Sequence, residues 1–457
     1  MTPASDSSLF IGIDVGTTSV KVGVFDREGN CPLLEEEGYP LEHPVPGAAE
    51  QDPTLVLAAT KRCLSTVMTT LDDPPAGVGL SCPMHSVIIL DSKYQPLSPV
   101  ITWADVRASA VMEELAEAER QSLWEHTGTP VHPMSPMVKL RWLLRENTYA
   151  GAHFLSDLKS FLVHHLTGGE FLLDQQLASA TGLYDARAGD WHPAALKVAG
   201  LLEGRETLRM TLPEVRPATT RLSWNKHLGE SLGLTGVPLF LGGSDGCLAN
   251  LGSGLLDPRS VAITVGTSGA VRATHREARI DPSLGLFNYQ LLDDYFVIGG
   301  ATNNGGKVLE YWQQLLMHHF ADVGEFIGAA LSVPRKKSPA FRPYLYGERA
   351  PLWDATATAA LEGLRGFHDH RHLARAVLEG VTDNLVAILR KLEAAIGKVD
   401  TLHASGGFTR SPPWLDLLAE RSGRQVVEAD TAQASAYGAA LIARMGVEGI
   451  GIENLHA

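Results

Sequence analysis

Two short glycine turns carry side chains suited to binding phosphate. Residues 14–18 read Asp-Val-Gly-Thr-Thr and residues 264–267 read Thr-Val-Gly-Thr, each after an apolar segment. Backbone N–H groups and hydroxyls at such a tip can donate hydrogen bonds to phosphate oxygens. Gly16 and Gly266 are 250 residues apart, the spacing of a repeated domain rather than of a solenoid repeat. Two such tips predict a polyphosphate site between two domains, although any β-hairpin with a Gly-Thr turn shares this pattern.

Asp14 distinguishes the first turn from the second, where Thr264 takes its place. A single carboxylate beside a phosphate-binding tip suits Mg²⁺, which keeps several waters and takes one or two carboxylates. A third glycine turn, Gly406-Gly407-Phe408, follows a short apolar segment later in the chain. The sequence has no Walker A loop, because residues 300–308 lack a required glycine and end in valine. A nucleotide is therefore expected to bind at the hairpin tips.

Asp245 follows the apolar run 237–241 within Gly243-Ser244-Asp245-Gly246. A carboxylate at a strand end over a cleft is a candidate general base for a hydroxyl nucleophile. The same residues also match the nucleophile elbow of an α/β-hydrolase, with Ser244 as nucleophile and a later histidine such as His403. That interpretation leaves both glycine-threonine turns and Asp14 unused. A turn without any chemistry is the third possibility.

Candidate residues for a polyhydroxylated ligand lie in the first half of the chain. Met84 and His85 precede an apolar segment, and Trp103 and Asp105 follow within about 25 residues. An indole face can stack on the C–H face of a sugar, while the imidazole and the carboxylate bind its hydroxyls. Taken singly, each is more often structural, and Asp105 with Arg107 could form an ordinary loop ion pair.

The alternating histidines His368, His370 and His372 raise the possibility of a metal site. The segment from His372 onward has the apolar period of a helix, and alternating residues at the start of a helix would not share one face. A helix start is therefore favoured over a metal site.

Composition narrows the classes of protein further. The 457 residues include 38 Lys+Arg and 52 Asp+Glu, for a formal net charge of −14, which argues against nucleic acid as the main partner. The four cysteines are far apart, so neither a thiolate zinc cluster nor a disulfide framework is expected. No apolar run reaches the roughly 18 residues of a membrane span. Because the N-terminus also lacks a signal-peptide pattern, we expect a cytoplasmic protein with no membrane partner.

Strands and helices alternate in both halves of the chain, which predicts an α/β protein. Residues 5–15 and 20–26 alternate like a hairpin, and residues 158–167 have a helical period that ends at two glycines. Residues 435–444 form a predicted helix of small side chains that could pack closely under a sheet. The expected division is an N-terminal domain of residues 1–244 and a C-terminal domain of residues 245–457.

These residues together resemble the FGGY family of carbohydrate kinases, over nearly the whole chain. Two long patterns carry the resemblance in order, residues 134–146 and residues 359–379. The family implies two ribonuclease-H-like domains of the actin-like superfamily, with a catalytic cleft between them. It also implies transfer of a phosphoryl group from ATP to a sugar hydroxyl.

The resemblance assigns roles to the residues already singled out. It implies that Asp245 is the catalytic base and that Asp14 acts through Mg²⁺. The substrate would be bound by Met84, His85, Trp103, Asp105 and Asp245. The nucleotide would be bound by Gly16, Thr17, Thr18, Lys21, Gly266, Thr267, Gly306, Gly407 and Phe408.

Within the family the chain is most similar to the gluconate kinases, through stretches that include residues 102–107, 303–306 and 347–353. Ser86 favours gluconate over xylulose by resemblance, since xylulose kinases commonly have glycine there. Arg107 and Lys139 are hypotheses for binding the carboxylate of a sugar acid. A xylulose or other pentulose or polyol kinase is the alternative, and a nucleotide-switched interaction protein like actin is a more distant one. Family members usually continue beyond the helix at residues 435–444, so we expect a less stable nucleotide side or a homodimer.

Overall fold

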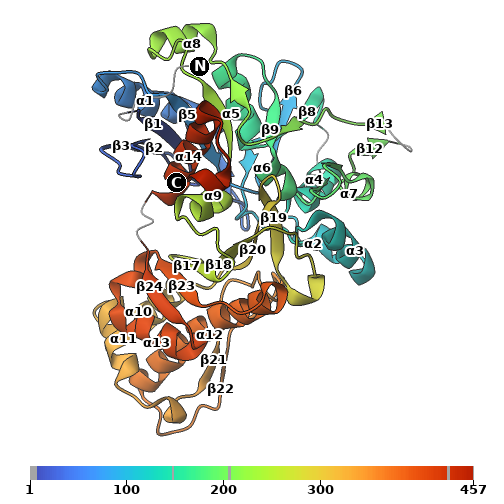
Figure 1. Ribbon diagram of the computed structural model, residues 1–457. Coiled ribbons are helices and arrows are strands. Elements are labelled where there is room, and N and C mark those ends of the chain that lie inside the picture. The colour runs from blue at the N-terminus through green and yellow to red at the C-terminus, as the bar shows by residue number, and fades with distance from the viewer. Residues whose placement is uncertain (1–7, 147–148, 204–206, 430–432, 456–457) are drawn as a thin grey trace.

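The computed structural model describes residues 8–146, 149–203, 207–429 and 433–455. Its two largest sheets each have six strands (Figure 1). The first has the order β15 (Arg221–Leu222), β16 (Leu239–Ser244), β5 (Gly77–Cys82), β1 (Phe10–Val15), β2 (Ser19–Phe25) and β3 (Leu33–Gly38). The second has the order β19 (Phe287–Leu292), β20 (Tyr295–Thr302), β18 (Gly269–His275), β17 (Ser260–Val265), β23 (Thr401–Ser405) and β24 (Gln425–Glu428).

The two sheets share one arrangement of strands, as the repeated turn predicts. In the first sheet β1 pairs antiparallel with β2 and parallel with β5, and in the second β17 pairs antiparallel with β18 and parallel with β23. The strands that flank them, β3 and β16 in one sheet and β20 and β24 in the other, also match in direction. Each glycine-threonine turn therefore connects the two strands of the equivalent hairpin in its sheet.

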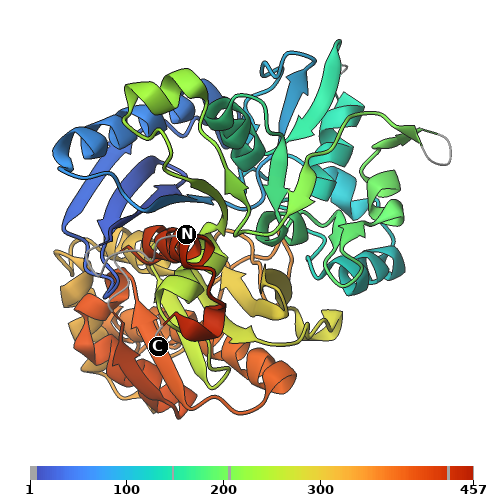
Figure 2. The same cartoon turned by 45° about the horizontal axis from the view of Figure 1, so that its top comes forward.

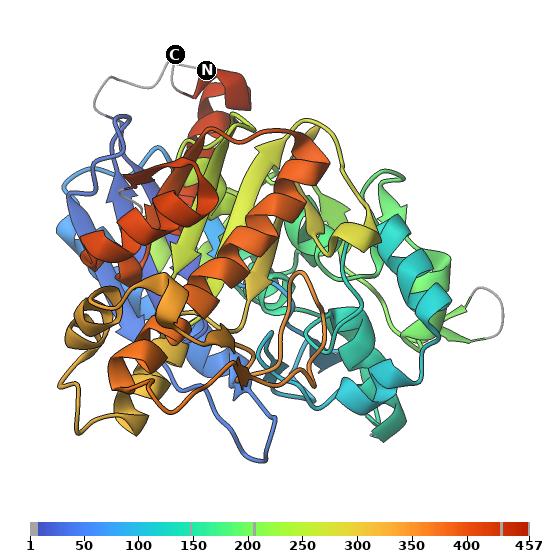
Figure 3. The same ribbon diagram turned by 90° about the horizontal axis from the view of Figure 1, so that it is seen from below.

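Helices cover both faces of the first sheet and one face of the second, and the central strands β1 and β17 are largely buried. The first sheet carries α1 (Pro53–Thr70), α5 (Leu158–Thr167) and α14 (Ala434–Glu448). The second carries α10 (Gly306–Leu315), α11 (Val323–Leu331), α12 (His370–Ile396) and α13 (Pro412–Ser422). The long helix α12 runs across the strands of the second sheet (Figure 3).

Helix α14 comes from the end of the chain yet packs on the first sheet (Figure 2). Side chains would not fit between them, because a Cβ at Gly12 or at Gly79 would lie 1.8 Å or 1.9 Å from the carbonyl oxygen of Ala436 or Ala439. Helix α14 also packs on α9 (Asp245–Gly252), which starts where β16 ends. The predicted small-residue helix under a sheet is confirmed. The domain division at residues 244 and 245 stays a prediction.

A smaller region lies beside the first sheet, at the right of Figure 1. Its helices are α2 (Ser109–Glu113), α3 (Glu117–Thr127), α4 (Pro136–Glu146), α6 (Gln175–Ser179) and α7 (Pro193–Val198). Helix α8 (Lys226–Ser231) lies at the top of the view instead, where its Leu228 packs on the core of the first sheet. The strand pairs of the smaller region are β4 (Glu50–Gln51) with β7 (Val100–Ile101), β6 (Ile88–Asp91) with β8 (Ala152–Ser156), β9 (Leu172–Asp174) with β14 (Glu214–Arg216), β10 (Tyr184–Asp185) with β11 (Asp190–Trp191), and β12 (Leu202–Glu203) with β13 (Thr207–Leu208). The last pair, β21 (Ala340–Arg342) with β22 (Ala360–Glu362), belongs to the second half of the chain.

Local signals in the sequence locate several of these elements correctly. Helix α5 ends with Gly168 in the left-handed region at φ 79°, as the two glycines predict. Helix α12 starts at His370, and Asp369 with His372 forms a capping box at its first turn. Within the described ranges, no helix combines the length and the apolar character needed to cross a bilayer.

Candidate active site

The first glycine turn is held against the strands and loops around it. Gly16 N–H donates to the carbonyl of Ser19 (2.8 Å), and the Tyr39 hydroxyl donates to the Gly16 carbonyl (2.7 Å). The indole N–H of Trp103 donates to the Thr17 hydroxyl (3.1 Å), which links this turn to the predicted sugar side. Thr18 is exposed at the tip. The turn is therefore fixed in place and open to a ligand at its end.

Asp14 lies at the end of β1, between Lys21 of β2 and Ser81 of β5. The Ser81 hydroxyl donates to its carboxylate (2.8 Å). Burial raises the pKa of Asp14 to about 6, the negative charge of Asp245 adds to this effect, and Ser81 and Lys21 oppose it. Two carboxylates that lie close enough for one to raise the pKa of the other also attract a cation. This arrangement fits a divalent metal ion.

Three segments of the second half meet at the second glycine turn. Gly306, the first residue of α10, donates its N–H to the Gly266 carbonyl (2.7 Å). Gly406 has φ 95°, and a Cβ there would lie 2.6 Å from the Val265 carbonyl oxygen. A helix N-terminus and exposed hairpin amides thus converge at one place, and both favour an anion. Thr267 is exposed at this tip, whereas Phe408 is buried edge-to-face against Trp414.

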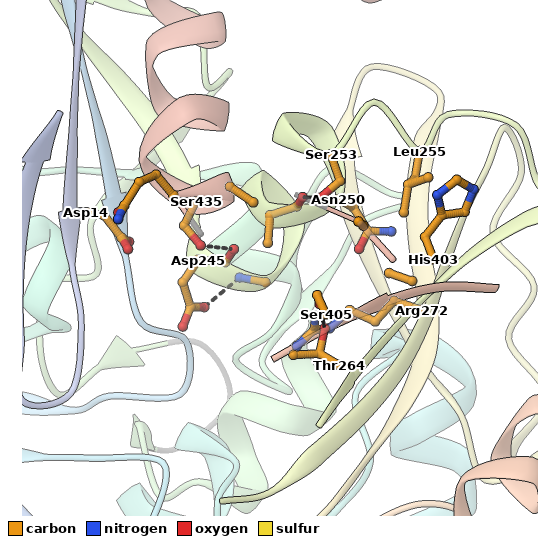
Figure 4. Close-up of a pocket in the computed structure, with 16 residues that line it drawn as sticks. Asp14, Asp245, Asn250, Ser253, Leu255, Thr264, Arg272, His403, Ser405 and Ser435 are labelled. Carbon is orange, nitrogen blue, oxygen red and sulfur yellow. Dashed lines mark hydrogen bonds between the residues drawn. The ribbon is translucent and has the colours of Figure 1, made fainter. Parts of the chain in front are cut away.

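Asp245 is the first residue of α9, whose N-cap is Ser244. Its carboxylate accepts a hydrogen bond from the N–H of Gly246 (2.7 Å). Burial raises the pKa of Asp245, and the positive charge of Arg272 opposes this effect. Figure 4 shows Asp245 between Asp14 on one side and Thr264, Arg272 and Ser405 on the other.

Asp245 lines two neighbouring cavities, together with Thr264 and Arg272. The first, of ≈ 260 Å³, also has Asp14, Asn250, His403 and Ser405 in its wall (Figure 4). The second, of ≈ 340 Å³, brings together residues of both halves of the chain, Thr17, Met84, His85, Trp103, Gly266, Tyr289 and Arg349 among them. The fold thus brings four of the five predicted substrate-binding residues to one cavity, beside both glycine turns.

His85 is held rigidly in the second cavity. It has a positive φ of 65°, which is uncommon for a side chain of this kind and occurs mostly where the surroundings enforce it. Its Nδ1–H donates to the Ala180 carbonyl (2.8 Å), and the Tyr289 hydroxyl lies 3.4 Å from Nε2. Burial lowers the pKa of His85 to about 3, so the ring is neutral. A fixed neutral imidazole suits hydrogen bonding to a hydroxyl.

The fifth predicted substrate residue, Asp105, lies elsewhere. Its side chain is fully buried, and it accepts hydrogen bonds from the Ala49 N–H (3.1 Å) and from Arg107. Arg107 also pairs with Glu50, and Lys139 is buried with its ammonium donating to the carbonyls of His85 and Met134. These contacts are structural, and neither Arg107 nor Lys139 borders the second cavity. A substrate role for Asp105 stays a prediction.

The residues of the second cavity that sequence reasoning missed include Arg272, Tyr289 and Arg349. Arg349 donates to the Thr302 carbonyl (3.1 Å), and its guanidinium carbon lies 5.1 Å from the centre of the Trp103 ring. The segment 347–353, which contains Arg349, stands out in the sequence, but no spacing rule assigns its arginine to a cavity that both halves of the chain form.

The hydrolase interpretation fails on the environment of Ser244. This side chain is completely buried, and its hydroxyl accepts the N–H of Cys247 (3.3 Å) as a helix N-cap. Its other neighbour is the amide of Gln176, so no histidine base contacts it within the described residues. A nucleophilic serine must face its substrate and a base, and Ser244 faces neither.

Comparison with known proteins agrees with this geometry. The family model for the N-terminal domain of the FGGY carbohydrate kinases matches residues 9–252, and the model for the C-terminal domain matches residues 261–447. The chain belongs to the FGGY family of carbohydrate kinases. It is therefore a carbohydrate kinase with the two-domain, actin-like fold of this family, and ATP is the phosphoryl donor that the family implies.

Several FGGY kinases are similar to this chain over almost its whole length. A gluconokinase of Bacillus subtilis (strain 168) is 32% identical over 455 residues, covering 95% of this chain and 87% of the relative. A xylulose kinase of Lactococcus lactis is 28% identical, with coverage of 95% and 87%. A crystal structure of a gluconate kinase from Lactobacillus acidophilus superposes with a TM-score of 0.91 at 30% identity, covering 98% of this chain and 91% of that one. The xylulose kinase from the same organism gives a TM-score of 0.90 at 30% identity, with the same coverage.

Proposed function

We propose that this FGGY kinase transfers the γ-phosphoryl group of ATP to the 6-hydroxyl of D-gluconate, with Asp245 as the general base. The position of Asp245 carries the proposal, since its carboxylate lines both cavities next to the two glycine turns. Similarity to a gluconokinase of Bacillus subtilis and to a gluconate kinase of Lactobacillus acidophilus supports gluconate as the substrate.

The reaction requires little covalent chemistry from the protein, so positioning and charge stabilisation dominate. The Asp245 carboxylate takes the proton of the sugar hydroxyl while the hydroxyl oxygen forms a bond to the γ-phosphorus. The bond from that phosphorus to the bridging oxygen breaks, and ADP leaves. Burial of Asp245 raises its pKa, which makes the carboxylate a better proton acceptor than an exposed aspartate.

The nucleotide phosphates are proposed to bind the two glycine turns. Gly16, Thr17 and Thr18 would contact them from one half, and Gly266, Thr267 and Gly306 from the other, with Lys21 near the first turn. Gly407 and Phe408 would border the nucleoside, although Phe408 would have to do so by its backbone because its ring is buried. Asp14 would hold Mg²⁺, a role that the raised pKa of its carboxyl beside Asp245 fits. The ion, when bound, neutralises charge on the phosphate oxygens.

Removal of the base tests the proposed mechanism. In the Asp245→Asn variant we expect kcat to fall about 10²- to 10⁴-fold, because proton transfer to a positioned base contributes that much. Binding of ADP, measured by titration calorimetry, should be preserved. Asp257→Asn, at an exposed aspartate paired with Arg259, is the matched control and should leave kcat unchanged. Turnover by Asp245→Asn at the wild-type rate would exclude Asp245 as the base.

A survey of acceptors tests the substrate. A coupled assay of ADP release across gluconate, xylulose, ribulose, glycerol and erythritol should give its highest kcat/KM with gluconate. Xylulose is the second candidate, which the similarity to xylulose kinases favours. A higher kcat/KM with xylulose would replace gluconate by that alternative. ADP release that no sugar stimulates would contradict the kinase proposal and favour a nucleotide-switched protein.

A further inference from the structure

Arg272 is a charged side chain of the active site that the proposed mechanism leaves without a role. It lies on β18 and lines both cavities beside Asp245. Figure 4 shows it on the far side of Asp245 from Asp14. Its Nε would be 3.8 Å from a Cβ placed on Gly246, the residue after the base. Burial lowers the pKa of Arg272, but an arginine in this range keeps its charge.

The described residues leave the guanidinium of Arg272 without a hydrogen-bond partner. In the part of the chain that the structure describes, it forms no hydrogen bond and no ion pair, not even with Asp245. Enclosed arginines elsewhere are paired, as Arg107 is with Glu50 and Arg375 with Glu379. Buried charges without partners are costly, and they occur where a ligand or a reaction needs them. Arg272 is thus placed to bind an anion that the protein itself does not supply.

The register of β18 brings Arg272 to the wall of the second cavity. The strand begins at Gly269, directly after the second glycine turn, and Ala270 and Arg272 lie on the same face. Both line the second cavity, and Arg272 lies about 7 Å farther along the strand from the turn. Its neighbours include Met84 and Tyr289.

Arg349, the other arginine of this cavity, already has contacts within the protein. It donates to the Thr302 carbonyl, and Thr302 pairs with Gly269 at the start of β18. Its charge acts on His85 and Tyr289 of the same cavity, and Glu348 supplies a nearby negative charge. One N–H group of this guanidinium is hydrogen-bonded to the Thr302 carbonyl, and its charge lies over the face of the Trp103 ring. Arg272 has neither kind of contact.

The charge of the second cavity favours an acidic ligand. Its charged lining residues are Asp245, Arg272 and Arg349, while His85 is neutral. The formal charge is thus +1, and it rises when Asp245 takes the substrate proton. A neutral ketose or polyol would leave Arg272 unpaired, whereas a sugar acid brings a carboxylate that a planar guanidinium can bind through two N–H groups.

We propose that Arg272 binds the carboxylate of the sugar acid and so makes this kinase select an acidic over a neutral acceptor. This inference rests on the proposed gluconate kinase activity. It replaces Arg107 and Lys139, whose charged groups are engaged in contacts outside the cavity.

The test compares gluconate with its neutral amide in the Arg272→Gln variant, at one fixed pH for all enzymes and ligands. We expect KM for gluconate to rise about 10- to 100-fold, because a hydrogen bond to a charged group contributes about that factor to binding. The inhibition constant of D-gluconamide and KM for ATP should change less than twofold, because neither ligand uses the contact. Arg272→Lys, which keeps the charge, should restore part of the loss.

Other outcomes overturn the inference without ambiguity. An equal loss for gluconate and gluconamide, or a fall in kcat with KM unchanged, would assign Arg272 to the transferred phosphoryl group or to Asp245. An unchanged KM in a variant that folds normally by circular dichroism would remove Arg272 from binding, while gluconate turnover by the wild type would leave the proposed function intact. A wild type that uses only neutral sugars would exclude both. Arg276→Gln, at an exposed arginine just beyond β18, is the matched control and should leave KM unchanged.

Discussion

Asp14 and Asp245 line the same cavity, yet different groups surround their carboxylates. Asp14 accepts a hydrogen bond from Ser81 and lies across the hairpin from Lys21. Asp245 lies at the start of a helix, where the Gly246 N–H donates to its carboxylate and the positive charge of Arg272 acts on it. Two carboxylates in different environments can take different roles. This pair suits one carboxylate that holds a cation and one that accepts a proton.

The raised pKa of Asp245 has a consequence for the pH dependence of the reaction. A base must be ionised, so kcat/KM should fall as the pH drops through the pKa of Asp245, tenfold per pH unit below it. Because burial raises this pKa, the acid limb should lie above the ordinary aspartate value of about 3.9. A pH profile of kcat/KM from pH 4 to 9, with excess coupling enzyme as control, checks it. A profile that stays flat down to pH 4 would contradict the assignment.

Substitution of Arg349, the other arginine of the second cavity, tests whether Arg349 and Arg272 have different roles. Arg349→Gln should lower kcat with gluconate and with a neutral acceptor by the same factor, because its guanidinium is already engaged by the Thr302 carbonyl and the Trp103 ring rather than free for a substrate carboxylate. We expect a loss of about 10- to 100-fold for a charged hydrogen bond. Steady-state kinetics with both acceptors measure it. A loss confined to gluconate would exchange the roles of Arg349 and Arg272.

Local patterns in the sequence predict the helices and strands far better than they predict the residues of the site. The hairpins, the glycine end of α5 and the small residues of α14 are legible because strand alternation, capping and helical period act within a few residues. The bond from Trp103 to Thr17, 86 residues apart, has no such signal. Arg272 reaches the cavity only through the register of β18 beside β17 and β20, which long-range pairing decides.

Close packing between α14 and the first sheet should make Gly12 intolerant of any side chain. A Cβ there would lie 1.8 Å from the Ala436 carbonyl oxygen, so Gly12→Ala must displace the helix. We expect a loss in free energy of unfolding of about 1–3 kcal/mol or more, as for overpacked cores. Urea unfolding measures it. Gly328→Ala on α11, with no atom within 4 Å of the new Cβ, is the control and should be neutral or slightly stabilising.

At the scale of the whole molecule, the repeated fold creates one site from two halves. Each sheet presents a glycine turn at the end of its hairpin, and the cavities between them take their walls from both. Helix α14 joins the end of the chain to the first sheet, so the halves are connected by packing as well as by the backbone. The net charge of −14 is no obstacle to phosphate, because backbone amides and a bound cation can replace lysine and arginine.

Shared walls predict that the two ligands bind cooperatively. Asp245, Thr264 and Arg272 border both cavities, so a ligand in one changes the position and charge of groups in the other. We expect gluconate to tighten the binding of a non-hydrolysable ATP analogue at least fivefold, and the analogue to tighten gluconate by the same factor, as linkage requires. Titration calorimetry with each ligand, in the presence and absence of the other, measures both factors. Identical Kd values with and without the second ligand would show that the cavities act independently. In that case Asp245 would still serve the transfer, but the two halves would not need to move together to complete the site.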